Sequence, residues 1–283
     1  MNYRHAFHAG GFADVVKHSV LALLIERLKL KDTAFRVIDT HAGIGLYDLT
    51  SSEALRSGEW HEGVGRLWQH PLQPGLAALL APWLEAVKAA NPDRDRLRFY
   101  PGSPWIARAL FRRQDRLTAV ELHPKDAKAL ATLFAGDVQV RTIALDGWLA
   151  LGAFLPPKER RGLVLVDPPY EETDEFERLF DGFVNSHQRW PTGIFALWYP
   201  VKDLAAVDRL RVRLAQSGIR RLLRAELTVR ERGADGTFNG TGLVICNPPW
   251  QFAELLEALL GGLVPILSQG SGAGHLIDEI AGE

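Results

Sequence analysis

The sequence contains little cysteine and no long hydrophobic run. Its 283 residues include one cysteine, Cys246, which excludes an internal disulfide and a metal cluster built from cysteines alone. This usage fits a reducing compartment, so we expect a cytoplasmic protein. Charge, glycine or proline interrupts every apolar stretch before it reaches the length of a bilayer, and the polar segment Met1–Lys17 lacks the apolar core of a signal peptide. We therefore expect no membrane partner.

An excess of positive charge is missing as well. The chain carries 33 Lys and Arg against 34 Asp and Glu, a formal net charge of -1, whereas nucleic-acid-binding domains are often strongly basic. For binding, the position of the cations matters more than their sum. The charge balance is therefore compatible with a nucleic-acid substrate only if the cations are segregated on one part of the surface.

The pattern of the chain predicts one large α/β domain. Its composition, 47% hydrophobic and 24% charged, is typical of a soluble globular protein. Short β-rich runs alternate with helical stretches, which predicts a doubly wound, mostly parallel sheet of seven strands that binds ligands at the carboxyl ends of its strands. The last two runs leave no room for a crossover helix, so they should form an antiparallel hairpin that closes the sheet edge. The predicted strands are Arg36–His41, Leu117–Leu122, Val138–Leu145, Gly162–Pro168, Gly193–Pro200, Leu222–Arg230 and Gly242–Asn247.

Two segments fall outside this alternation. The segment 47–91 contains three tryptophans among Leu and Ala at helical spacing and no convincing β run, so we expect a small helical insertion there. The segment 269–283 begins with a Gly/Ser-rich stretch and is expected to be a mobile tail. Residues 1–46 and 92–268 then form the main domain.

The strongest local pattern is the strand Val164–Val166 followed by Asp167-Pro168-Pro169-Tyr170. Two prolines cannot continue a sheet, and they hold the backbone rigid at the strand end. The turn then presents the Asp167 carboxylate and the Pro168 carbonyl as fixed acceptors, with Tyr170 beside them as a flat surface. The two hydrogens of an exocyclic amine on a nucleobase need two such acceptors, and Tyr170 would stack on a flipped base. We therefore expect Asp167 to hold a reacting amine.

A second turn of the same kind, Asn247-Pro248-Pro249-Trp250, follows the last predicted strand. Enzymes that act on planar amino or amide nitrogens use either an acid or an asparagine in this turn, so Asn247 is an alternative to Asp167. Its strand belongs to the closing hairpin, far in order from the first strands. We therefore favour Asp167 and expect residues 247–250 to form a structural turn.

Three other strand ends carry residues suited to a nucleoside cofactor. The first strand ends in Asp39-Thr-His41-Ala-Gly43-Ile-Gly45, where two glycines let the backbone pass close to a ligand and the missing third glycine argues against a dinucleotide site. Glu121 ends the next strand, where a carboxylate accepts from both ribose hydroxyls. Asp146 and Gly147 end the third strand and suit an adenine amine.

In this order, the motifs resemble those of class I S-adenosylmethionine-dependent methyltransferases. The segment Tyr3-Arg-His-Ala-Phe-His-Ala-Gly10, followed by Ala13-Asp-Val-Val-Lys-His18, is similar to the bacterial family of 23S rRNA adenine-N6 methyltransferases that modify adenine 2030. The similarity extends over essentially the whole chain. It implies a Rossmann-like methyltransferase fold, S-adenosyl-L-methionine as cofactor, 23S rRNA as partner and methylation of an adenine N6 amine in ribosome biogenesis.

The resemblance also implies roles for single residues. Asp167 would be catalytic and would also contact the cofactor, while Tyr3 and Tyr170 would contact substrate RNA. No metal is expected, because the histidines lack zinc-site spacing with a carboxylate or cysteine and methyl transfer from a sulfonium needs none. One departure is Gly11, where the family usually has Asn, so any contact of that amide is missing here. The remaining expected cofactor-binding residues are His18, His41, Ser103, Glu121, Asp146 and Gly147.

Two alternatives to an rRNA adenine methyltransferase remain. The same turn serves DNA adenine and protein-glutamine methyltransferases, although a site-specific DNA enzyme is expected to have a larger recognition domain than segment 47–91. A non-catalytic RNA-binding protein on the same fold is the other alternative, and the intact acids and turn argue against it. For an RNA substrate we expect cations to surround the Asp167 pocket and acids to lie mainly on the opposite face. The expected cations are Arg4, Lys17, Arg56 and Arg66.

Overall fold

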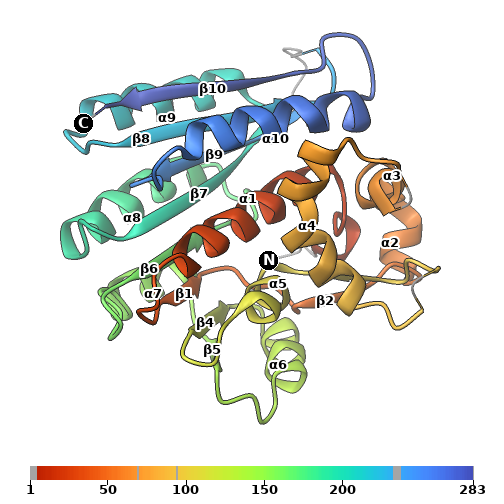
Figure 1. Ribbon diagram of the computed structural model, residues 1–283. Helices are drawn as coiled ribbons and strands as arrows, with labels where there is room; N and C mark the ends of the chain where they lie inside the picture. Colours follow the sequence, from red (N-terminus) through yellow and green to blue (C-terminus); the bar gives the residue numbers. More distant parts are fainter. Residues whose placement is uncertain (1–4, 69, 94, 232–236, 283) are drawn as a thin grey trace.

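The computed structural model describes residues 5–68, 70–93, 95–231 and 237–282 (Figure 1). Its centre is an eight-stranded sheet with the order β10-β8-β9-β7-β6-β1-β4-β5. The strands β5, β4, β1, β6 and β7 run parallel, and β9, β8 and β10 add antiparallel pairs at one side. The strand bounds are β1 Arg36–Asp39, β4 Arg116–Glu121, β5 Val140–Ala144, β6 Gly162–Val166, β7 Ile194–Val201, β8 Leu222–Thr228, β9 Gly240–Cys246 and β10 Gly274–Ala281.

All seven predicted strands are present, and the mostly parallel α/β class is confirmed. The predicted hairpin of β8 and β9 also forms, but it does not close the sheet. β9 lies between β7 and β8, and β10 covers the outer side of β8.

The expected mobile tail at residues 269–283 is therefore wrong for most of its length. Gly274–Ala281 forms β10 and pairs antiparallel with β8, from Gly274 opposite Thr228 to Ala281 opposite Leu222. The physical reason is that β8 otherwise has unpaired backbone donors and acceptors along one side. The strand is hard to predict because it is an edge strand of half-exposed residues and carries no apolar run.

Helices cover both faces of the sheet. A hydrophobic core lies on each face of the sheet, and β6 contributes to both. Leu163 and Leu165 face one core, while Val164 and Val166 face the other. Alternate side chains of a strand point to opposite faces, so a sheet buried on both sides needs an unbroken apolar run. The first core is covered by α1 (Phe12–Lys29), α4 (Pro74–Ala89), α5 (Ser103–Leu110), α6 (Pro124–Leu133) and α10 (Phe252–Leu267), the second by α7 (Gly147–Ala153), α8 (Glu175–Arg189) and α9 (Leu204–Gln216).

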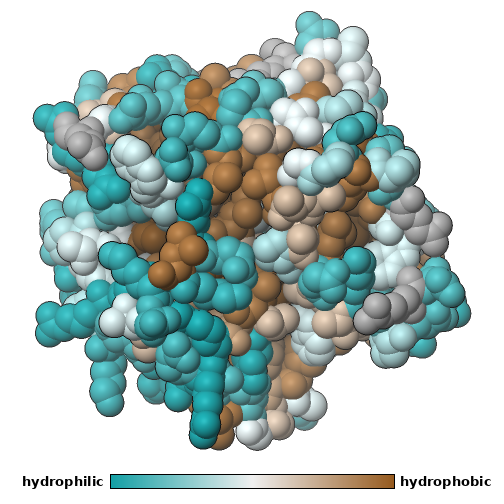
Figure 2. All heavy atoms as spheres, in the orientation of Figure 1, coloured by the Kyte–Doolittle hydropathy of each residue, from teal (hydrophilic) through white to brown (hydrophobic). Residues whose placement is uncertain are grey.

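The segment 47–91 is mainly helical, with α2 (Ser52–Ser57), η2 (Glu59–Glu62), α3 (Val64–Trp68) and α4. Its start differs from the expectation, because β2 (Leu46–Asp48) pairs antiparallel with β3 (Phe99–Pro101). α4 packs on α1, α5 and α10, and its Trp83 is fully buried. Figure 2 shows apolar side chains gathered in the middle of the face of the molecule that it draws, where α1, α4 and α10 lie in Figure 1. The segment thus shares the first core with the main domain.

A short helix, η1 (His5–Phe7), precedes α1. Within the described ranges, no helix combines the length and the hydrophobicity needed to cross a membrane.

Candidate functional site

A cavity of about 510 Å³ opens at the carboxyl ends of β1, β4, β5 and β6, beside the start of α1. Its volume lies in the range of roughly 300–1,000 Å³ typical of small-molecule sites. Parallel strands bring their carboxyl ends to one edge, which explains why residues far apart in the sequence meet here. Tyr3 and Arg4 lie outside the described residues. The other expected site residues all line this cavity, namely His18, His41, Ser103, Glu121, Asp146, Gly147, Asp167 and Tyr170.

Glu121 fixes the glycine loop after β1. Its Oε2 accepts a hydrogen bond of 2.8 Å from the Gly43 amide, and its Oε1 accepts one of 2.8 Å from the His123 amide. Gly43 has φ of +59°, and a Cβ there would overlap the Tyr47 hydroxyl, so the loop requires glycine. Burial raises the pKa of Glu121, although both amides favour its ionised form. The expected ribose acceptor is therefore also a structural part of the loop.

Asp146 and Gly147 form the start of α7. The Asp146 side chain caps the helix by accepting a hydrogen bond of 2.7 Å from the Trp148 amide. A Cβ on Gly147 would overlap the Thr40 carbonyl and the His41 ring. The absence of a side chain at Gly147 thus lets the turn after β5 approach the loop after β1.

The two expected cofactor histidines are neutral at pH 7. Burial lowers the pKa of His18 to about 3, and its Nδ1 lies 2.8 Å from the Tyr100 hydroxyl. Burial also lowers the pKa of His41 to about 4, and its Nδ1 lies 2.8 Å from Thr40 Oγ1. Uncharged rings of fixed orientation are suited to hydrogen bonds with a ligand rather than to ion pairs.

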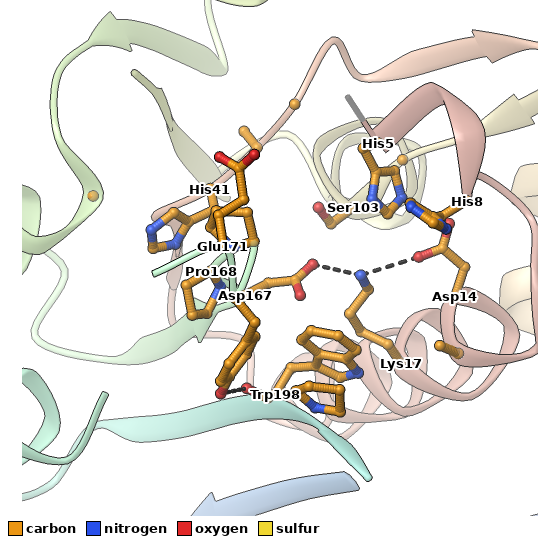
Figure 3. Close-up of a pocket in the computed structure, with 18 of the residues that line it drawn as sticks. His5, His8, Asp14, Lys17, His41, Ser103, Asp167, Pro168, Glu171 and Trp198 are labelled. Atoms are coloured by element: carbon orange, nitrogen blue, oxygen red, sulfur yellow. Dashed lines mark hydrogen bonds and ion pairs between the residues drawn. The ribbon is translucent and has the colours of Figure 1, made fainter. Parts of the chain in front are cut away.

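The Asp167 carboxylate pairs with a buried ammonium. Lys17, from the first turns of α1, forms an ion pair with Asp167 Oδ2 and a second one of 3.0 Å with Asp14 Oδ1. Figure 3 shows the ammonium between the two carboxylates. Burial alone would lower the pKa of Lys17, but the two carboxylates outweigh it and the pKa is raised. Lys17 is therefore charged, and its ion pair fixes the position of the Asp167 side chain.

The expectation for Lys17 as an RNA-binding surface cation is wrong, because only 2% of this residue is exposed. Its partner Asp14 is equally buried and accepts a hydrogen bond of 3.0 Å from the Gly10 amide. Asp14 Oδ2 also lies 2.9 Å from His5 Nε2. This chain of contacts joins η1, the start of α1 and the Asp167 turn, so the N-terminal block is part of the site.

Tyr170 is held rigidly at the pocket wall. It has φ of +52°, in the left-handed region that a non-glycine residue seldom adopts, and its hydroxyl donates a hydrogen bond of 2.8 Å to the Trp198 carbonyl. The Trp198 ring lies 5.5 Å from the Tyr170 ring, and Lys17 Nζ lies 5.2 Å from the Trp198 ring. The sequence interpretation did not assign Trp198, Asp14 or His5 to the site. For Trp198, an aromatic near the carboxyl end of a predicted strand was the available signal.

The alternative turn at Asn247 lies at the opposite edge of the sheet. β9 runs antiparallel to β7, and its last residue, Cys246, pairs with Phe195 at the start of β7. Asn247 has φ of +55°, and its amide donates hydrogen bonds of 2.8 Å to the carbonyls of Pro191 and Gly193. These contacts fit a structural turn, and they place Asn247 away from the cavity.

Of the cations expected around the pocket, Arg56 and Arg66 do not line the cavity, so this part of the expectation is wrong, while Arg4 lies outside the described residues. The Arg66 guanidinium donates to the Ile266 and Ser268 carbonyls and pairs with Glu62, and Arg56 lies 5.9 Å from the Phe7 ring. Acids dominate the described lining, with nine carboxylates against the three cations Lys17, Arg178 and Lys202. The carboxylates are Asp14, Glu59, Glu121, Asp126, Asp146, Asp167, Glu171, Glu172 and Glu175.

The space beside Gly11 is filled from the segment 47–91. A Cβ at Gly11 would lie 3.1 Å from the His8 carbonyl oxygen and 3.2 Å from Glu59 Oε2, and His8 Nδ1 pairs with Glu59 Oε1 at 2.9 Å. A larger side chain at position 11 would have to move the Glu59 carboxylate. Nowhere in the described ranges do three or more His, Cys, Asp or Glu side chains form a group that could hold a metal ion.

The strand order, the glycine loop and the acids at successive strand ends define a class I, Rossmann-like methyltransferase fold. Residues 32–277 match the family model described as ribosomal RNA large subunit methyltransferase D, RlmJ, and the chain belongs to this family. It is 43% identical to ribosomal RNA large subunit methyltransferase J of Escherichia coli (strain K12) over 97% of this chain and 96% of that protein. It is 42% identical to the protein of the same name from Haemophilus influenzae over 96% of each.

A solved structure shows the same fold. Protein LPL1258 from Legionella pneumophila superimposes with a TM-score of 0.86 and 32% identity, covering 96% of this chain and 98% of that chain. The fold therefore has a counterpart of nearly equal length over 96% of this chain.

Proposed function

We propose that this protein transfers a methyl group from S-adenosyl-L-methionine to the exocyclic N6 amine of an adenine in 23S rRNA, with adenine 2030 as the expected target. The family membership and the names of its curated relatives, which are large-subunit rRNA methyltransferases, support an RNA substrate. Such a substrate implies action in the cytoplasm, on ribosomal RNA as the partner.

The observation that carries this proposal is the ion pair between Lys17 and Asp167 in the rigid turn after β6. The pair engages Asp167 Oδ2, and Oδ1 has no hydrogen-bond partner among the described residues. Asp167 Oδ1 and the Pro168 carbonyl are the two acceptors that we propose for the two amine hydrogens. Holding both hydrogens directs the nitrogen lone pair away from the ring plane. The Tyr170 ring, fixed by its hydroxyl, is the proposed stacking surface for the adenine.

The residues of the cavity fit S-adenosyl-L-methionine, which supplies an electrophilic methyl group on a sulfonium. The glycines Gly43 and Gly147 leave room that a Cβ would fill, and Glu121 keeps lone pairs for ribose hydroxyls beside its two amide bonds. The proposed cofactor contacts are His18, His41, Ser103, Glu121, Asp146, Gly147 and Asp167. Catalysis by these residues consists mainly of positioning, and Tyr3 remains a proposed RNA contact.

Mapping N6-methyladenine in 23S rRNA from cells with and without this protein tests the proposal. We expect one adenine to lose its methyl group in the deleted strain. The purified protein should restore it with S-adenosyl-L-methionine, whereas Asp167→Ala should bind the cofactor and transfer no detectable methyl. Methylation of DNA or of a protein glutamine instead would replace the RNA substrate. Cofactor-independent RNA binding without any transfer would support the non-catalytic alternative.

A further inference from the structure

A group of exposed cations in the described part of the chain lies opposite the cofactor cavity. We call one edge of the sheet the amino-terminal edge. At this edge the strands β1, β4, β5, β6, β7 and β8 begin. Because these strands point the same way, the segments that precede them all reach this edge. Seven exposed cations lie in these segments or at the strand starts, namely Lys31, Arg113, Arg141, Lys158, Arg160, Arg189 and Arg220.

These seven cations are available to a ligand. No hydrogen bond or ion pair joins their side chains to another residue in the described part of the chain, and Arg141 only stacks on the Phe154 ring at 5.5 Å. Asp32 at the same edge is exposed, but two other acids there are held by arginines. Glu159 pairs with Arg36 at 2.8 Å and Asp115 with Arg112 at 3.0 Å. The edge therefore has a net positive charge, in contrast to the acidic lining of the cofactor cavity.

The edge is also hollowed. A groove of about 440 Å³ opens between the starts of β1, β4 and β5 and the segment before β6, and four of its described lining residues are cations, namely Arg36, Arg116, Arg141 and Lys158. At the other end of the edge, Trp250 follows β9 and is 83% exposed. Cations in a groove bind a nucleic-acid backbone, and an exposed aromatic ring elsewhere on the same edge stacks on an unpaired base.

We propose that the amino-terminal edge binds the phosphate backbone of the substrate RNA at a second site, away from the adenine that is methylated. This proposal rests on RNA being the substrate, as in the proposed function. β6 starts at Gly162 and Asp167 follows its end, so the edge lies about 17 Å from the reacting group at about 3.3 Å per residue. A folded RNA is wide enough to reach both. A short RNA that only fills the pocket does not need the edge.

The physical need for such a site follows from the charge of the cavity. Phosphate contacts supply much of the affinity for a nucleic acid, and a cavity lined by nine carboxylates against three cations offers phosphates little attraction. Cations on another surface within reach of the same RNA supply the missing phosphate contacts. The amino-terminal edge carries seven such cations among the described residues.

The test compares the double variant Arg141→Glu/Lys158→Glu with the unmutated protein on two RNAs, a large 23S rRNA fragment and a short hairpin, both containing the target adenine. We expect the double variant to bind the fragment at least tenfold more weakly. Its slope of log affinity against log salt should fall by about 1.4, since each contact with a single strand contributes about 0.7. Turnover on the hairpin and affinity for S-adenosyl-L-methionine should not change. Lys158→Glu alone keeps the Arg141 stack and should give about half the effect on the slope.

The matched control is Lys128→Glu/Arg209→Glu, which changes two exposed cations on α6 and α9 by the same total charge. We expect this control to bind the fragment within about twofold of the unmutated protein. Equal losses in both double variants, or an unchanged affinity in Arg141→Glu/Lys158→Glu, would overturn the second site. A protein that methylates no RNA at all would instead contradict the proposed function, and the binding measurement would still report on the edge.

Discussion

At the scale of single residues, the charge state of the candidate site depends on one buried ammonium. Lys17 lies between Asp14 and Asp167, and without it two carboxylates would face each other in a largely buried site. Removing one partner of a buried ion pair costs about 3–5 kcal/mol, because the remaining charge is left uncompensated. The stability of the fold and the reactivity of Asp167 are thus coupled through the same side chain.

Lys17→Met should therefore lower the free energy of unfolding by about 3–5 kcal/mol and abolish methyl transfer. Denaturant unfolding measures the first effect, and turnover at a temperature where the variant is folded measures the second. Lys17→Met/Asp14→Asn removes one of the two facing carboxylates, so it should recover part of the stability without recovering turnover. Full activity in either variant would show that Lys17 has no part in positioning Asp167.

A second buried group predicts the effect of pH on stability. Asp39 at the end of β1 is 1% exposed, and burial raises its pKa from 3.8 to about 7. Between these pH values the folded protein keeps the Asp39 proton while the unfolded chain has lost it. The stabilisation linked to this proton is present below pH 4 and is lost as pH rises through 7.

Asp39→Asn stays uncharged at every pH, so it should gain stability relative to the unmutated protein as pH rises. One pKa unit corresponds to about 1.4 kcal/mol, and we expect a gain of a few kcal/mol at pH 8.5 and almost none at pH 4. Urea unfolding of both proteins across this range is the measurement. A difference that is constant with pH would mean that Asp39 does not titrate in this range.

At the scale of elements, strand direction decides which of the two Pro-Pro turns reaches the cavity. The two turns are nearly equal in sequence, but β6 runs toward the cavity and β9 runs away from it. Asn247 instead supports the turn through two carbonyls. Asn247→Ala should cost about 1–3 kcal/mol of stability, through the lost hydrogen bonds and a positive φ that alanine tolerates poorly. Turnover of the folded variant should stay within about tenfold, and a well-folded but inactive Asn247→Ala would reverse the choice of turn.

The strands that could be predicted from the sequence are those buried on one or both faces, such as β6, because a continuous apolar run marks them. β10 could not be predicted, since an edge strand next to β8 is stabilised by backbone pairing and its half-exposed side chains leave no pattern. The short β2 was missed for a similar reason, as its three residues pair only with the equally short β3.

The same distinction holds for the site. Residues at strand ends, such as Glu121 and Asp167, were predictable because parallel strands bring their carboxyl ends together. The pairing of Lys17 with Asp167 was not predictable, because 150 positions separate the two residues in the chain. An exposed lysine and a buried one look alike in a sequence. Only the elements that pack around α1 show that Lys17 is buried.

At the scale of the whole molecule, positive and negative charge are separated in the reverse of the expected arrangement. The cavity is acidic, and seven exposed cations lie at the amino-terminal edge. A protein with a net charge of -1 thus has two surfaces of opposite sign. The acidic surface is suited to a cationic cofactor, and the basic surface is suited to a polyanion.

The acidic lining predicts how salt affects the choice between cofactor and product. S-adenosylmethionine carries a positive sulfonium, whereas S-adenosylhomocysteine has a neutral sulfur and is otherwise the same apart from the methyl group. The nine carboxylates of the lining should favour the cation at low salt, and screening should reduce this preference by roughly 0.5–1 kcal/mol between 0.05 and 1 M salt. Calorimetric titration of both ligands across the salt series measures the ratio of the two affinities. Glu171→Gln/Glu172→Gln at the pocket rim should lower the low-salt preference, whereas Glu254→Gln/Glu257→Gln on α10, outside the cavity lining, should leave it unchanged. A ratio that does not vary with salt would show that the acids of the cavity do not act on the sulfonium.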